Sequence, residues 1–262
     1  MSFYRLSFLF AGVAFVAACD FFKRDKGKEK EAKPAKSPTP VYGKDQFVLI
    51  PKGTFTMGSE SGDGDEKPVH QVTLTRDYNL LAFGVPQKDY RRFAGATNRE
   101  MPDIPDDLKG DNRPMVRVNW EEARAFCQWA GGDLQTEAQW ERAAHGPGGN
   151  NEYPTGTGGP EGLHVSAEST VDVTSKTENQ LVWGGKVLYH MGGNVREWVL
   201  DWYGYYPSDH VVDPAGAGKG WSRALRGGSW SSLREKARAA NRDDVYPAYR
   251  DGSVGFRCAF PS

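Results

Sequence analysis

Glycine and tryptophan are the residues that most restrict the folds open to this chain. Its 262 residues include 31 glycines and 8 tryptophans, whereas long runs of leucine or valine are rare. This composition predicts an aromatic, loop-rich core with little regular secondary structure. The length and apolar content suit one compact domain with additional segments, and the formal net charge of −1 gives no indication of a nucleic-acid partner.

The start of the chain has the organisation of an export signal. Arg5 precedes an apolar run over residues 6–16, and small residues then lead to Cys19. The run is too short to span a bilayer as a mature helix. The pattern resembles the bacterial lipobox, in which the cysteine is lipidated and becomes the new N-terminus. We therefore expect residues 1–18 to be a lipoprotein signal peptide and Cys19 to be the lipidated residue. An uncleaved anchor, or an ordinary secretion signal with a chance cysteine, is the alternative.

The segment after this signal has a composition that does not fold by itself. Residues 19–41 are rich in Lys, Glu, Pro and Ala, which bury too little apolar surface to form a core. We expect a tether that connects the lipid anchor to a folded domain over residues 42–262. The protein is then extracytoplasmic and anchored to a bacterial membrane, at the cell surface or on the periplasmic face. Asp20 resembles a signal for retention in the inner membrane, but this rule differs between lineages and leaves the leaflet open.

Strands are expected at the start of the folded domain. Apolar residues alternate over residues 46–51 and 53–58 around a Pro/Gly turn, which predicts an opening hairpin. Residues 70–74 continue as a strand. The Gly/Pro-rich residues 146–162 predict a long loop.

Three helices are predicted from their start signals. Pro86 precedes the first helix, Asn119 caps the second and Thr136 caps the third. Thr136 and Gln139 have the spacing of a capping box, and acidic residues stand where the helix dipole favours them. The predicted spans are residues 87–94, 121–130 and 137–144.

Seven motifs follow one another through most of the folded part. They are Phe47–Ser59, Pro68–His70, Pro114–Ala123, Leu134–Glu141, Gly192–Trp198, Arg226–Trp230 and Gly255–Cys258. In this order they resemble the formylglycine-generating enzyme (FGE, sulfatase-modifying factor) family. The resemblance implies an α+β fold, the FGE-type elaboration of the C-type lectin fold, loop-rich with short strands and about three helices.

The resemblance also identifies what an enzyme of this family would need. Its oxidase chemistry uses a pair of cysteine thiolates that hold copper, because soft thiolates select Cu(I). Counting from Arg226 places this pair at Ser232 and Ala237, and neither is a cysteine. We therefore expect no enzyme activity, no catalytic residue, no required cofactor and no copper.

The two cysteines within the folded part match positions that family members join as a structural disulfide. The resemblance therefore implies a bond between Cys127 and Cys258, which an oxidising compartment permits. Closing a loop of more than a hundred residues would stabilise the fold by about 5 kcal/mol in the chain-entropy model. The alternative is a thiol pair that binds metal or does redox work.

A calcium site is a further possibility that the resemblance raises. Other family members bind calcium through the Gly-Asn-Val segment, and the corresponding positions here are His190, Gly193, Val195 and Glu197. Calcium prefers oxygen ligands, so the histidine weakens the site. The site is either vestigial or completed by water; otherwise Asn194 and Glu197 only brace a turn.

Short blocks alternate with scaffold-like residues after Arg226. The blocks comprise Ser231, Ser232, Leu233, Asp243, Asp244, Val245, Tyr246, Ala248, Tyr249, Asp251, Gly252, Ser253 and Val254. This layout resembles the variable region of retroelement-diversified lipoproteins of C-type lectin fold, whose randomised codons cannot encode Lys, Glu, Gln, Trp or Met. None of these five types occurs in the blocks. Tyrosine with Ser, Asp and Gly is also the mixture favoured in evolved binding sites.

We therefore expect the blocks to form a ligand-binding face, whose partner is a protein or another surface ligand. Two alternatives stay open. One is a degenerate FGE-like envelope lipoprotein with a fixed protein partner. The other is an FGE-family oxidoreductase that uses non-cysteine residues, which would need a polar pocket with a poised carboxylate such as Glu197, Asp201 or Asp243.

Overall fold

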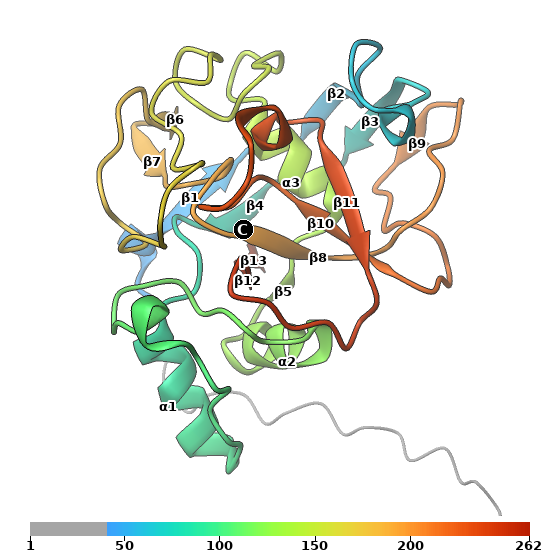
Figure 1. The fold of residues 1–262 in the computed structure, drawn as a ribbon. Coiled ribbons are helices and arrows are strands. Elements are labelled where there is room, and N and C mark those ends of the chain that lie inside the picture. Colours follow the sequence, from blue (N-terminus) through green and yellow to red (C-terminus); the bar gives the residue numbers. More distant parts are fainter. Residues whose placement is uncertain (1–40) are drawn as a thin grey trace, which may run out of the picture. The chain divides into compact units, whose positions relative to one another are not determined.

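The computed structural model describes residues 41–262, and Figure 1 shows their arrangement. The predicted signal peptide, the lipidated Cys19 and the tether up to residue 40 lie outside the described residues. Residues 41–262 contain three α-helices and thirteen strands, which form two four-stranded sheets, a three-stranded sheet and a two-stranded hairpin. Among these residues, no helix combines the length and the apolar character that a membrane span requires.

The first four-stranded sheet joins early and late parts of the described chain. It contains β1 (Phe47–Ile50), β4 (Tyr78–Leu81), β13 (Cys258–Pro261) and β5 (Asp133–Leu134), in this spatial order. All of its neighbours are antiparallel. The strand β13 therefore lies between β4 and β5 and connects them.

The predicted opening hairpin is wrong. The strand β1 pairs with β4, whereas β2 (Gly53–Met57) pairs with β3 (His70–Leu74) in the three-stranded sheet. Between β1 and β2, Lys52 N donates a hydrogen bond of 2.8 Å to Asp77 Oδ1. This bond lies where the chain leaves the first four-stranded sheet and enters the three-stranded sheet. Apolar alternation identifies the buried side of a strand but not the strand it pairs with, and this is why the prediction failed.

The second four-stranded sheet positions the C-terminal part of the domain. It contains β11 (Arg242–Val245), β10 (Arg223–Arg226), β8 (Arg196–Trp202) and β12 (Val254–Phe256), in this spatial order. The strand β12 runs parallel to β8, and the other pairs are antiparallel. The remaining strands are β9 (Val211–Val212), beside β3, and the hairpin of β6 (Leu181–Trp183) and β7 (Lys186–Leu188).

Three helices form where the start signals predict them. They are α1 (Gln87–Thr97), α2 (Trp120–Trp129) and α3 (Glu137–Ala144). Both predicted caps are present, since Asn119 accepts from Glu122 N at 2.9 Å and Thr136 accepts from Gln139 N at 3.1 Å. Helix α1 continues three residues beyond its predicted end and stops where Asn98 adopts the left-handed conformation, with φ of 53°.

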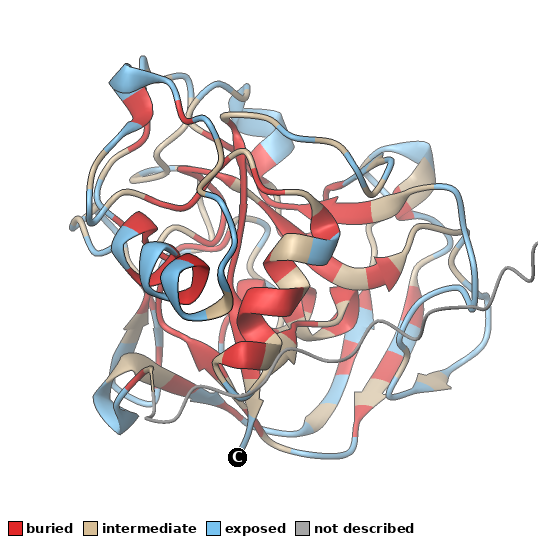
Figure 2. Ribbon diagram, turned by 90° about the horizontal axis from the view of Figure 1, so that it is seen from below, coloured by how far each residue is buried: buried red, intermediate tan, exposed pale blue. Residues whose placement is uncertain are grey.

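The core is aromatic, as the composition indicates. Tyr90, Phe93, Phe126 and Phe256 are buried, and Tyr90 and Phe126 each contact the other three rings at centroid distances of 5.3 to 6.4 Å. Figure 2 shows buried residues on the strands and on the inner sides of the helices, and much of the exposed surface on the loops and on the outer sides of the helices. Residues 146–162 contain no helix or strand, in agreement with the predicted loop.

Candidate ligand-binding face

The segment that carries the predicted blocks is anchored by buried arginines. Arg226 in β10 forms an ion pair with Glu141 and donates to the carbonyls of residues 240 and 241 at 3.0 and 2.8 Å. Arg242 in β11 donates to both carboxylate oxygens of Glu137 at 2.7 and 2.9 Å. Each guanidinium is matched to a carboxylate of α3, so the backbone before and within β11 is fixed to that helix.

The first block lies between β10 and the short helix η4 (Arg234–Ala237). Ser232 Oγ lies 3.0 Å from Ser229 N and 2.9 Å from Ser229 Oγ, and the side chain of Ala237 is fully buried. Leu233 is 71% exposed. The first block therefore offers an apolar contact and a hydroxyl, and the two positions that the enzymes give to cysteine contain no metal ligand of the thiolate kind.

The second block occupies most of β11, at the edge of the second four-stranded sheet, and ends at Tyr246. Asp243 pairs with Arg196 of β8, and Asp244 is exposed. Tyr246 is 61% exposed, and its ring contacts Tyr249 edge to face at a centroid distance of 5.7 Å. The pair gives this part of the face a rigid aromatic surface.

The loop between Tyr246 and β12 is held against the start of α2. Arg250 NH2 donates to Glu122 Oε1 at 2.6 Å, and Trp120 N donates to the carbonyl of Pro247 at 3.0 Å. Trp230 Nε1 donates to the carbonyl of Gly252 at 3.1 Å, which connects this loop to the first block. The exposed Tyr246 and the partly buried Tyr249 therefore stand on a backbone that is fixed at several points.

Two residues of the predicted face do not belong to it. Val254 is fully buried because it begins β12 and pairs with Arg196. Ser253 is 6% exposed, and its hydroxyl bonds to Asp251 and Arg196. The residues available to a ligand therefore end at Gly252. We call the remaining residues 231–233, 243–246, 248–249 and 251–252 the C-terminal face.

Arg196 is a residue of this face that the sequence did not suggest. It bonds to Asp243 and to Ser253 Oγ, at 3.2 Å in the second case, and so joins the second block to the last one. In Figure 1, η4, β11 and the loop before β12 all lie toward the viewer. No sequence pattern could pair Arg196 with Asp243, since 47 residues separate them.

Two residues of the predicted calcium site, Glu197 and His190, have protein partners in this structure. Glu197 is buried and accepts from Gln135 Nε2 at 2.8 Å, from Trp140 Nε1 at 3.0 Å and from Arg257 Nε at 2.9 Å. His190 Nε2 lies 3.0 Å from a serine hydroxyl, and burial, with a second histidine nearby, lowers the pKa of His190 to about 4. Glu197 is therefore matched to a buried guanidinium, and His190 stays neutral.

The described residues contain an acidic cluster at a different place from the predicted calcium site. Within residues 41–262, only Asp63, Asp65 and Glu66 bring three potential metal-ligating side chains together. Arg238 donates to both carboxylate oxygens of Glu66 at 2.7 and 2.6 Å, and Lys236 lies 2.7 Å from Asp63. These cations match two of the three carboxylates and fix η4 and the residue after it to the loop after β2.

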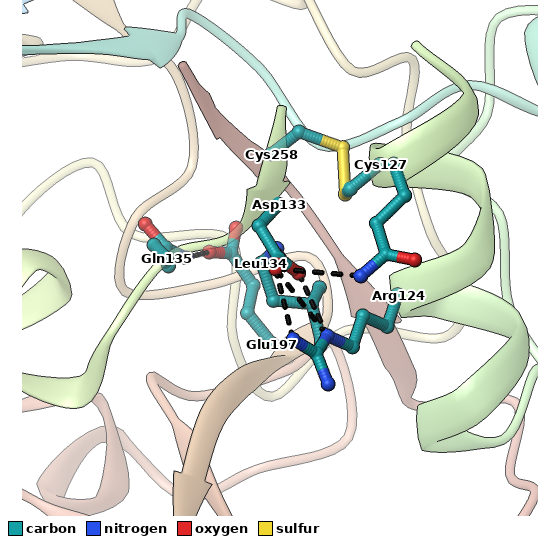
Figure 3. Close-up of a disulfide and its surroundings, with 8 residues drawn as sticks. Arg124, Cys127, Asp133, Leu134, Gln135, Glu197 and Cys258 are labelled. Carbon is teal, nitrogen blue, oxygen red and sulfur yellow. Dashed lines mark hydrogen bonds and ion pairs between the residues drawn. A yellow bond between two sulfur atoms is a disulfide. The ribbon is translucent and has the colours of Figure 1, made fainter. Parts of the chain in front are cut away.

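The two cysteines of the folded part are joined in the structure. The Cys127–Cys258 disulfide connects α2 to β13, with 5.4 Å between the Cα atoms, and Figure 3 shows its surroundings. Beside it, Arg124 Nε and NH2 each donate to Asp133 at 3.0 Å. The disulfide and the ion pair therefore fix the same helix to the sheet formed by β1, β4, β13 and β5.

Known proteins resemble this chain over nearly all of its described residues. A family model described as sulfatase-modifying factor enzyme 1-like domain matches residues 32–261. The formylglycine-generating enzyme of Streptomyces coelicolor is 29% identical over 294 residues, which cover 87% of this chain and 92% of the enzyme. Serine/threonine-protein kinase pkn1 of Chlamydia pneumoniae is 32% identical over 237 residues, which cover 82% of this chain. The chain spans 38% of that kinase's length.

A solved structure supports the predicted fold. Treponema denticola variable protein 1 superposes with a TM-score of 0.67 at 22% identity, covering 82% of this chain and 95% of that one. The predicted loop-rich α+β fold of FGE type is confirmed.

Proposed function

The chain belongs to the family of sulfatase-modifying factor enzyme 1-like domains, and from this membership we propose that it binds a ligand without oxidising a substrate thiol. The observation that carries the proposal is the chemistry at positions 232 and 237. A serine hydroxyl already engaged by Ser229 and a buried alanine methyl stand there. Copper(I) prefers soft thiolate ligands, and this pair offers none.

The C-terminal face supports the binding part of the proposal. Its exposed side chains include Tyr246, Leu233, two aspartates and Ser231, and Tyr249 and Ser232 are partly exposed beside them. Tyrosine supplies large contact area at low entropic cost, and small polar residues supply adaptable hydrogen bonds. The backbone beneath them is fixed by Arg226, Arg242 and Arg250, so little ordering would be needed on binding.

The location and origin of the face are part of the same proposal. The lipobox pattern before Cys19 favours an extracytoplasmic protein that is anchored to a bacterial membrane by lipid. A disulfide between α2 and β13 suits an oxidising compartment. The residue types of the blocks, which lack Lys, Glu, Gln, Trp and Met, and the likeness in fold to a protein named as variable, favour diversification of the face by a retroelement.

Sequencing the DNA around the gene tests the diversification. We expect a reverse-transcriptase gene and an imperfect repeat of the region that encodes residues 231–254, with its differences at adenines. Absence of both would refute diversification, and the C-terminal face would then be assigned to a fixed protein partner.

An oxidation assay tests the absence of thiol chemistry. The full chain is incubated with copper, oxygen and a cysteine peptide that the Streptomyces coelicolor enzyme converts, and the peptide mass is followed. We expect no conversion by this chain and full conversion by the control enzyme. Formation of the aldehyde by this chain would refute the proposal.

A further inference from the structure

A cavity of about 270 Å³ lies apart from the C-terminal face, next to the chain that joins β8 to β9. Strands β2, β3, β8, β9 and β11 and helix α3 each contribute to its wall, and residues 204–207 and 214–217 line it as well. In Figure 1 this connection lies beyond the end of β8, to the right. The volume is at the lower end for ligand sites, so it suits a small molecule or one side chain of a larger partner.

The cavity contains a buried carboxyl group that has no cation bonded to it. Asp201 is 2% exposed, and the one hydrogen bond to its carboxyl group from residues 41–262 is donated by Glu137 N at 2.8 Å. The other buried carboxylates nearby are each paired with an arginine, as described for Glu137 and Glu141. Burial of an acid beside other acids is costly unless the group is protonated or receives a positive partner.

The protonation state of Asp201 follows from its surroundings. Burial and the nearby carboxylate of Glu137 raise the pKa of Asp201 to about 8, although Arg242 and Arg226 oppose this shift. Arg223 lies nearby on β10, and His70 of β3 lines the same cavity. Asp201 is therefore mostly neutral at pH 7 and becomes an anion above pH 8.

Four of the five N–H donors of the arginine in the cavity wall are engaged within the domain. Arg242 Nε and NH2 bond to Glu137, and NH1 donates to the carbonyls of Asp65 and Gly204 at 2.8 and 3.1 Å. Its charge is matched by Glu137, so it is a poor partner for an anionic ligand. No cation among the described residues is hydrogen-bonded to Asp201, so a cationic ligand could match this carboxyl group once it ionises.

A second acceptor and apolar walls define the ligand further. His70 Nδ1 lies 3.1 Å from the carbonyl of Pro68, which can only accept, so Nδ1 carries the proton and Nε2 is an acceptor in the neutral ring. The walls include Met57, Ala138 and Val211, which favour methylene groups. We propose that this cavity binds the terminal ammonium group of an alkyl chain, as carried by a lysine side chain or a free alkylamine. The ammonium group would take the two acceptors, and its chain would lie along the apolar wall.

Binding of n-pentylammonium to the full chain tests the proposal by calorimetry at two pH values. The ligand stays charged at both, since an alkylamine has a pKa of about 10.4. Because the ammonium group prefers the ionised Asp201, binding should be about 20-fold tighter at pH 8.5 than at pH 6.5. The neutral alcohol 1-pentanol should show no such increase.

Two variants separate the carboxyl group from the fold. Asp201→Asn keeps the shape and an acceptor for Glu137 N, and it should weaken binding at pH 8.5 by at least about tenfold. Asp209→Asn removes the same charge from an exposed position that does not line the cavity, and it should bind like the parent. Near-ultraviolet circular dichroism checks that each variant is folded.

The outcomes are decisive in either direction. Absence of n-pentylammonium binding at pH 8.5, equal binding by Asp201→Asn, or binding that does not strengthen with pH would each overturn the proposal. If Asp201→Asn does not fold, the pH series on the parent chain decides.

A second experiment uses the tripeptide acetyl-Gly-Lys-Gly-amide. Binding of this peptide identifies a lysine side chain as the source of the ammonium group, and binding of n-pentylammonium alone identifies a free amine.

Discussion

Reduction of the Cys127–Cys258 disulfide should destabilise the domain by an amount that the chain length determines. The bond closes a loop with a sequence separation of 131 residues. In the chain-entropy model such a loop corresponds to about 17 cal/mol/K, or about 5 kcal/mol at 25 °C, relative to the open unfolded chain. For a domain of about 220 residues, unfolding entropy of about 2.1 cal/mol/K per residue converts this into a Tm lower by about 10 °C.

Thermal unfolding followed by circular dichroism, with and without reductant, measures the difference. The matched control is the double variant Cys127→Ala with Cys258→Ala, whose Tm should not respond to reductant. This variant should be no more stable than the reduced parent, because it also loses two buried side chains. Equal melting of the parent in reducing and oxidising buffer would refute the reasoning.

Three further predictions concern buried charge and the exposed face. Arg242→Met removes both hydrogen bonds from Arg242 to the buried Glu137 and leaves Arg226, at 3.6 Å, as its remaining ion-pair partner. It should cost about 3 kcal/mol in urea unfolding, whereas Arg91→Met, which breaks an exposed ion pair, should cost less than about 1 kcal/mol. Tyr246→Ala should change stability by less than about 0.5 kcal/mol, because the ring is mostly exposed; a loss above 2 kcal/mol would assign it to folding. Burial raises the pKa of Glu141, but the charge of Arg226, His145 and the hydrogen bond from Gly58 N together outweigh burial and bring the pKa to about 2. Because this folded-state pKa is depressed, stability should fall as pH drops from about 4.5 toward 2, and Glu141→Gln should lose that dependence in a Tm series.

The helices could be predicted because their signals are local. Asn119 and Thr136 each exchange hydrogen bonds with a residue three positions later, so a stretch of four residues contains the information. Strand pairing is not local in this way. The partner of β1 is β4, and the alternating pattern that identifies β1 as a strand does not specify it.

In the candidate site too, features set by local sequence could be predicted, and features set by strand pairing could not. The blocks could be identified from their amino-acid types, and the structure leaves most of their residues at least partly exposed. Ser253 and Val254 were misplaced because the start of β12, and therefore their burial, depends on pairing with β8. The cavity at Asp201 could not be located from sequence either, since its walls come from six elements that are distant along the chain.

The position of β13 between β4 and β5 sets an order for the assembly of the domain. Until β13 is available, β4 and β5 each expose an unpaired edge, and Cys127 has no partner. Exposed strand edges favour association with other chains. If the protein is exported as we propose, the nascent domain therefore passes through the translocation step with this sheet still open. A chaperone that covers strand edges on the far side of the membrane would then improve its yield.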